Sequence, residues 1–132
     1  MRTLDVVHPR LRDAVPKILE AMKTLGYPMM VTDTLRTVEE QKVLYAQGRT
    51  TPGPIVTYRD GVTKKSDHQA KKDGLGYAVD CCFLVDGKPS WDTRLPWKLY
   101  GLIATTLGLK WGGSWTKPFD LPHIYVEETP DV

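Results

Sequence analysis

The chain has 132 residues, enough to bury a hydrophobic core without disulfides or metals, and we expect one domain over residues 1–132. The net charge is +2, with basic side chains spread along the chain, whereas nucleic-acid-binding domains usually carry a clustered basic patch. No apolar stretch is long enough to span a bilayer, and Met1–Asp5 lacks the apolar segment of a secretory signal. We therefore expect synthesis in the cytoplasm, no membrane insertion and no nucleic-acid partner.

The first half of the chain predicts two helices and a short strand. Asp13–Leu25 carries apolar residues at helical spacing, and Gly26 stops the helix. Met29–Thr32 is predicted as a strand. The second helix spans Thr37–Gly48, because Thr37 and Glu40 form the sequence pattern of a capping box at its start.

The second half predicts mainly strands. The expected elements are a loop over 49–66 with a hairpin at Asp60-Gly61, a strand over 77–85 closed by a turn at Asp86-Gly87, a helix over 97–107 ended by Gly108, a Gly-rich segment over 111–115, and a strand over 123–127. Helices followed by strands mixed with a helix indicate an α+β fold, with a small antiparallel sheet flanked by about three helices.

The two cysteines, Cys81 and Cys82, are adjacent in an apolar run. Neighbours on a strand point to opposite faces, so a disulfide between them is geometrically poor. We interpret both as buried small hydrophobic residues, typical of a reducing compartment. Zinc ligation by Cys82 remains an alternative.

Two histidines and one carboxylate, His68, Asp80 and His123, form a sufficient ligand set for a catalytic zinc. Asp80 lies among apolar residues, where an unpaired carboxylate is costly to bury, so it needs a metal or an arginine as partner. Asp120, three residues before His123, supplies a spare carboxylate. Simpler interpretations remain for each ligand: a solvated loop histidine at 68, a buried Asp–Arg pair at 80, and a core histidine at 123.

Four motifs occur in an order that resembles a known family. They are Thr34-Leu35-Arg36-Thr37 with the helix that follows through Thr50, Ser66-Asp67-His68, Gly76-Tyr77-Ala78-Val79-Asp80, and Asp120-Leu121-Pro122-His123, preceded by Gly112, Gly113 and Trp115. From about Pro9 to Glu127 the chain resembles the VanY-like D-Ala-D-Ala carboxypeptidase / L-alanyl-D-glutamate endopeptidase family of zinc peptidases, which includes phage endolysins.

The resemblance implies a role for each motif. Zinc held by His68, Asp80 and His123 would activate a water molecule and polarise the scissile carbonyl, and Asp120 would act as general base and then acid. Arg36 would face the developing oxyanion or a substrate carboxylate, its alternative being a surface salt bridge. Ser66 would contact the substrate or hold its loop.

One departure from the family pattern concerns the spacing of the ligands. In the family pattern, Ser-x-His is followed almost directly by Gly-x-Ala-x-Asp. In this chain the segment Gln69–Leu75 lies between the two motifs, and it offers Asp73 as a rival carboxylate. A polar segment that contains glycine can bulge as a loop without moving the ligands. We prefer Asp80, because Asp73 has the neighbours of an exposed turn residue.

The resemblance leaves the substrate open. We expect a monomeric, phage endolysin-like zinc endopeptidase that cuts the L-alanyl-D-glutamate bond of bacterial peptidoglycan stem peptides after holin-dependent release to the cell wall. One alternative is a D-alanyl-D-alanine metallocarboxypeptidase. The other is a non-catalytic metal-binding module of the same fold.

Overall fold

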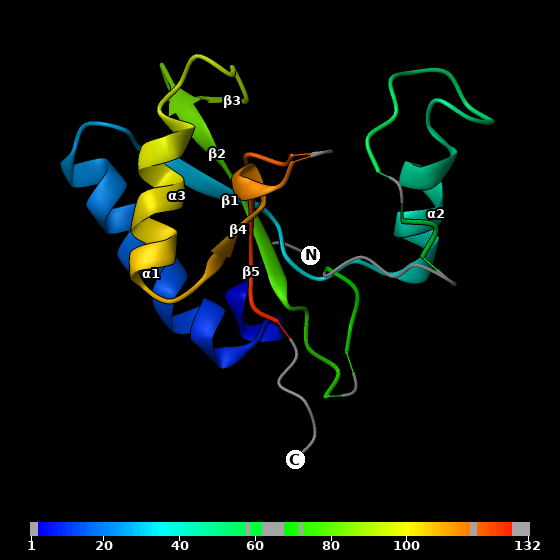
Figure 1. The fold of residues 1–132 in the computed structure, drawn as a ribbon, viewed down its shortest axis with the longest axis horizontal. Coiled ribbons are helices and arrows are strands. Elements are labelled where there is room, and N and C mark those ends of the chain that lie inside the picture. Colours follow the sequence, from blue (N-terminus) through cyan, green and yellow to red (C-terminus); the bar gives the residue numbers. More distant parts are fainter. Residues whose placement is uncertain (1–2, 58, 62–67, 72, 117–118, 128–132) are drawn as a thin grey trace.

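The computed structural model describes residues 3–57, 59–61, 68–71, 73–116 and 119–127. Over these residues the chain forms three α-helices, two short 3-10 helices and one antiparallel sheet of five strands (Figure 1). The elements are η1 (Leu4–Val6), α1 (Pro9–Thr24), β1 (Met29–Asp33), α2 (Val38–Ala46), β2 (Ala78–Val85), β3 (Lys88–Ser90), α3 (Trp97–Thr106), β4 (Lys110–Trp111), η2 (Gly112–Ser114) and β5 (His123–Tyr125). The predicted α+β class, with a small antiparallel sheet and three helices, is confirmed. Among the described residues, none of the helices has both the length and the apolar character needed to cross a membrane.

The sheet is organised around β2, its longest strand. β1 and β5 pair with β2, β4 pairs with β5, and β3 returns beside the end of β2. The predicted turn between β2 and β3 is confirmed: Asp86 and Gly87 have φ values of 53° and 74°, the left-handed conformation that a two-residue hairpin turn of this kind requires. β3 was not predicted from the sequence, because it has only three residues and contains a proline.

The two faces of the sheet have different roles. Val79 and Phe83 of β2 belong to the core formed with α1 and α3, and the Phe83 ring meets Trp97 of α3 edge-on, with ring centroids 4.7 Å apart. α1 and α3 lie side by side, whereas α2 stands apart from both of them (Figure 1). Because side chains alternate along a strand, Asp80 points to the face opposite the core. This second face carries the candidate site.

Helix α1 begins four residues earlier than predicted, at Pro9 instead of Asp13. His8 precedes the helix and its Nδ1 accepts a hydrogen bond from the backbone N–H of Arg10, while Pro9 fits the first helical position because no N–H is needed there. The buried side chains of α1 recur at helical spacing: Leu11, Ala14, Val15, Ile18 and Met22. Each large one contributes roughly 1.5–3 kcal/mol by leaving water.

Helix α2 has the capping box that the sequence predicts. The Thr37 hydroxyl accepts from the backbone N–H of Glu40 at 3.1 Å, and the Glu40 carboxylate accepts from the backbone N–H of Thr37 at 3.2 Å. Residues 49–57 and 59–61 form a loop, as predicted. A hairpin was predicted at Asp60-Gly61. Residues 62–67, which would form its second half, lie outside the described part of the chain.

Candidate metal centre and active site

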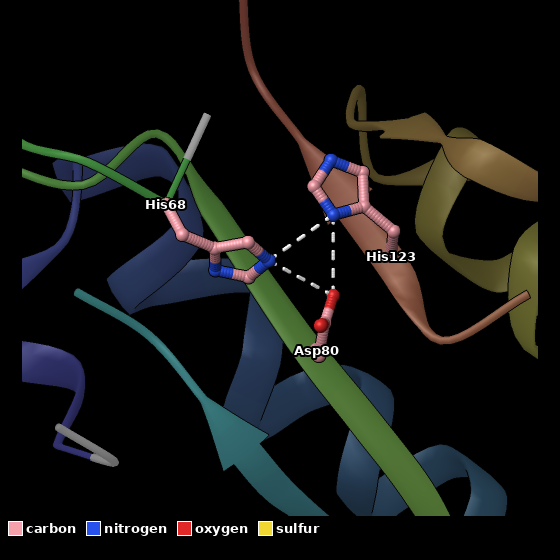
Figure 2. Close-up of side chains that lie close together, drawn as sticks. All are labelled: His68, Asp80 and His123. Carbon is pink, nitrogen blue, oxygen red and sulfur yellow. Dashed lines mark hydrogen bonds and ion pairs between the residues drawn. The ribbon is translucent and has the colours of Figure 1, made fainter. Parts of the chain in front are cut away.

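Strand pairing brings two of the three predicted metal ligands together. Asp80 of β2 and His123 of β5 are direct partners in the antiparallel register, so both side chains project from the same face of the sheet. His68 reaches the same point from the segment before β2 (Figure 2). The Oδ1 of Asp80 lies 3.1 Å from Nε2 of His68 and 3.2 Å from Nδ1 of His123, and the two nitrogens are 3.2 Å apart.

These separations match the geometry of a bound metal. Three ligands about 2.0–2.1 Å from a tetrahedral zinc lie about 3.3 Å from one another, close to the separations of the three donor atoms. The donor set of two imidazoles and one carboxylate is that of catalytic zinc sites, which keep a further position for water or substrate. Within the described ranges, His68, Asp80 and His123 form the group of His, Cys, Asp and Glu side chains that could hold a metal ion.

The orientation of His68 is fixed by the backbone. Its ring is 2% exposed, and its Nδ1 lies 3.0 Å from the carbonyl oxygen of Thr34. A carbonyl only accepts, so Nδ1 carries the proton and Nε2 presents its lone pair to the centre. The backbone N–H of Arg36 donates to the His68 carbonyl at 2.7 Å, which ties the same two segments together a second time.

The pKa values of Asp80 and Asp120 are shifted in opposite directions. Burial alone would raise the pKa of Asp80, but the imidazoles of His68 and His123 hold it well below its usual range. Burial, followed by the negative charge of Asp80, raises the pKa of Asp120, and the charges of the two imidazoles and of Arg36 act against that rise. A carboxyl group with a raised pKa holds a proton more readily, which suits a role in proton transfer.

Arg36 lies at this site, and it is also part of a salt bridge. Its guanidinium bonds to Asp33 through Nε and Nη2 and to the side-chain oxygen of Gln41 through Nη1, at 2.6 Å. The side chain is only 12% exposed, so this is not the surface salt bridge considered as an alternative. The charge of Arg36 nevertheless acts on Asp120.

Aromatic rings form one wall beside the centre. The His123 ring lies 5.0 Å from Trp115 and 5.3 Å from Tyr125, measured between centroids, and the indole N–H of Trp115 donates to the Tyr125 hydroxyl at 3.0 Å. Trp115 was noted in the sequence only as part of a Gly/Trp segment. Tyr125 was missed, although its place two residues after His123 puts it on the same strand face.

The alternative ligands lie outside this group. Asp73 accepts hydrogen bonds from the backbone N–H of Leu75 and the hydroxyl of Tyr77, in an exposed turn. The segment after His68 therefore loops out, as expected, and leaves Asp80 in place. Cys82 is buried and is not part of the metal-binding group, and burial raises the pKa of the neighbouring Cys81 thiol to about 12. The predicted substrate contact Ser66 lies outside the described residues.

Asp33 and Gln41, which hold Arg36, were given no role from the sequence. Gln41 is fully buried, a rare position for a glutamine, and its amide donates to the Thr57 hydroxyl and the Arg59 carbonyl. The signal for Asp33 is its position at the end of an apolar strand, three residues before an arginine. Such spacing is common in surface pairs, so it points to no site by itself.

Comparisons with known proteins agree with this geometry. A family model of peptidase M15, described as D-alanyl-D-alanine carboxypeptidase, matches residues 60–126. The peptidoglycan L-alanyl-D-glutamate endopeptidase CwlK of Bacillus subtilis (strain 168) is 33% identical over 127 residues, covering 89% of this chain and 72% of CwlK. The chain belongs to peptidase family M15.

Two solved structures share the fold of this M15 chain. The L-Ala D-Glu endopeptidase ChiX of Serratia marcescens matches with a TM-score of 0.63 and 24% identity, over 94% of this chain and 83% of ChiX. The LdcB LD-carboxypeptidase matches with a TM-score of 0.64 and 18% identity, over 90% of this chain and 58% of LdcB. At these identities the two likenesses establish the fold alone.

Proposed function

We propose that the chain is a zinc-dependent endopeptidase that hydrolyses the L-alanyl-D-glutamate bond of peptidoglycan stem peptides. The observation that carries this proposal is the group of His68, Asp80 and His123, whose three donor atoms are spaced as zinc ligands are. The choice of bond follows the similarity to CwlK, an L-alanyl-D-glutamate endopeptidase.

The metal would supply the electrophile. When bound, such an ion would polarise the scissile carbonyl and lower the pKa of a water molecule. Nε2 of His68, Oδ1 of Asp80 and Nδ1 of His123 would hold it, and the hydrogen bond from His68 to Thr34 keeps the first of these donors correctly oriented.

The remaining chemistry would come from the carboxyl and guanidinium groups beside the ligands. Asp120, with its raised pKa, would take the proton of the attacking water and deliver it to the leaving amine. Arg36 would face the oxyanion that develops on the scissile carbonyl, or a carboxylate of the substrate, where its planar fork of donors suits either anion. We also propose Ser66, two residues before His68 in the sequence, as a substrate contact.

A D-alanyl-D-alanine carboxypeptidase is the second candidate, because the family model that matches residues 60–126 carries that description. A non-catalytic metal-binding module is a weaker candidate, since such a module has no need for Asp120 or Arg36. The endolysin setting, release through a phage holin and a monomeric state remain predictions from the sequence.

Digestion of purified peptidoglycan, with and without a chelator, tests the proposal. We expect new amino-terminal D-glutamyl ends, identified by mass spectrometry, that disappear with chelator and return when zinc is added. Release of free D-alanine would favour the carboxypeptidase. If a folded, zinc-loaded protein produces neither D-glutamyl ends nor free D-alanine, the non-catalytic metal-binding module is the remaining candidate.

A further inference from the structure

We propose that Asp33 is a positioning residue that fixes the guanidinium of Arg36 at the active site. The inference rests on the proposed function, because it assigns Asp33 a part in the same reaction. Asp33 is the last residue of β1. Its carboxylate bonds to Thr34 and Arg36, and its effect on the site passes through Arg36.

Both oxygens of the Asp33 carboxylate have partners that orient it. Oδ1 accepts from the backbone N–H of Thr34 at 3.1 Å, and Oδ2 accepts from Nε of Arg36 at 3.2 Å and from Nη2 of the same guanidinium. Nη1, at the other end of the guanidinium, donates to Gln41. A planar group that is held at both ends by charged or amide acceptors has a single orientation, which a flexible arginine side chain does not have by itself.

A strand irregularity puts Asp33 in this place. The β1–β2 register runs from Met29 opposite Phe83 to Val31 opposite Cys81, and then Asp33, not Thr32, stands opposite Asp80. The extra residue is a β-bulge, a feature that re-aims side chains beside active sites. Without it, Asp33 would be shifted by one position and would point to the other face.

The bulge also places two carboxylates on directly paired residues, an arrangement that is unfavourable unless each has a counter-charge. Asp80 is matched by the imidazoles of His68 and His123, and Asp33 is matched by Arg36. The Asp33 and Arg36 side chains are 26% and 12% exposed, so solvent screens this pair less than a surface pair. From this fixed position, the charge of Arg36 acts to lower the pKa of Asp120.

A double-mutant cycle tests whether Asp33 acts through Arg36. Asp33→Asn, Arg36→Met and the combined variant are assayed for kcat and KM on a soluble L-alanyl-D-glutamyl stem peptide, with zinc content and Tm measured in parallel. We expect Asp33→Asn to keep its zinc and to lose roughly 10- to 100-fold in kcat/KM. It should cause no further loss in the Arg36→Met background. A full additional loss in that background, or loss of zinc from Asp33→Asn, would overturn the inference.

The exposed pair Asp92–Arg94 offers a matched control. Its carboxylate also contacts Nε and Nη2 of a nearby arginine, but the pair lies before α3, in an exposed turn. Asp92→Asn should leave kcat and KM unchanged. Should Asp33→Asn fail to fold, Asp33→Glu, which keeps the charge and moves the carboxylate by one methylene group, takes its place in the cycle with the same criteria.

A second readout separates this inference from the proposed function. The Nε–H of Arg36 should give an exchange-protected signal in ¹⁵N NMR, identified by its absence from Arg36→Met. We expect the signal to persist in Asp92→Asn and to lose its protection in Asp33→Asn. If the unmodified protein cleaves no stem peptide, the proposed function fails, and the NMR signal still decides whether Asp33 holds Arg36. Unchanged protection in Asp33→Asn would refute the inference even if the enzyme is active.

Discussion

Gly112 lies where the loop that carries Asp120 and His123 folds back against η2. A Cβ atom at this position would lie 2.6 Å from the carbonyl oxygen of Asp120 and 3.0 Å from Cβ of His123. Both contacts are with atoms close to the backbone, so a rotamer change does not relieve them. The same loop is held by hydrogen bonds from the Asp120 N–H to the Gly112 carbonyl and from the His123 N–H to the Asp120 carbonyl. The Gly112→Ala substitution should therefore displace the proposed metal ligand His123 and the proposed general base Asp120 together.

The size of the effect follows from the distances. Ordinary van der Waals contact begins at 3.4 Å, so the Asp120 carbonyl has to move by about 0.8 Å. Overpacking of this kind costs about 1–3 kcal/mol in the free energy of unfolding, which corresponds to a decrease in Tm of roughly 4–12 °C for a domain of this size. A displacement of reacting groups by about 1 Å can lower the rate about 100-fold.

The assay is peptidoglycan digestion, combined with zinc content and Tm of purified Gly112→Ala. We expect activity to fall by a larger factor than the loss of folded protein explains. Ser114→Ala, an exposed position two residues away in η2, serves as the control and should behave like the unmodified protein. Full activity and an unchanged Tm for Gly112→Ala would refute the close approach of Gly112 to the Asp120 loop.

Three further predictions concern the site itself. His68→Ala, Asp80→Ala and His123→Ala should each lose bound metal and activity together; stoichiometric zinc in any of them, measured by elemental analysis, would remove that residue from the ligand set. Asp120→Asn should keep zinc and lose about 10²- to 10⁴-fold in kcat, and a normal kcat would exclude it as general base. Because the pKa of Asp120 is raised above its usual 3.8, the metal-free fold loses stability as the pH rises through that raised pKa. Metal-free Asp120→Asn should therefore have the higher Tm at pH 7, and a gain that persists unchanged below pH 3.8 would contradict this origin.

Local signals in the sequence predicted most of the elements. The capping box at Thr37, the hairpin turn at Asp86-Gly87 and the apolar run of β2 each act over a few residues, and each appears where predicted. The start of α1 was wrong by four residues, because a histidine cap followed by proline is a weaker signal than the apolar periodicity after it. β3 was missed because its three residues pair only once the turn has formed.

For the site, the sequence determined the residue types: two histidines, a carboxylate that is costly to bury unpaired, and a further carboxylate before the last histidine. The resemblance to the zinc peptidases then favoured Asp80 over Asp73, which the structure places in an exposed turn. These conclusions depend on side-chain chemistry and short spacings, which a sequence states directly.

Only the tertiary structure decided how these groups meet. Asp80 and His123 are 43 residues apart, and the β2–β5 register determines that they share a face. The tertiary contact between His68 and Thr34 decides which ring nitrogen faces the centre, and the bulge in β1 decides that Asp33 holds Arg36. Strand register depends on the packing of the whole sheet, and a shift of one residue reverses every side chain, so no local pattern in the sequence contains that information.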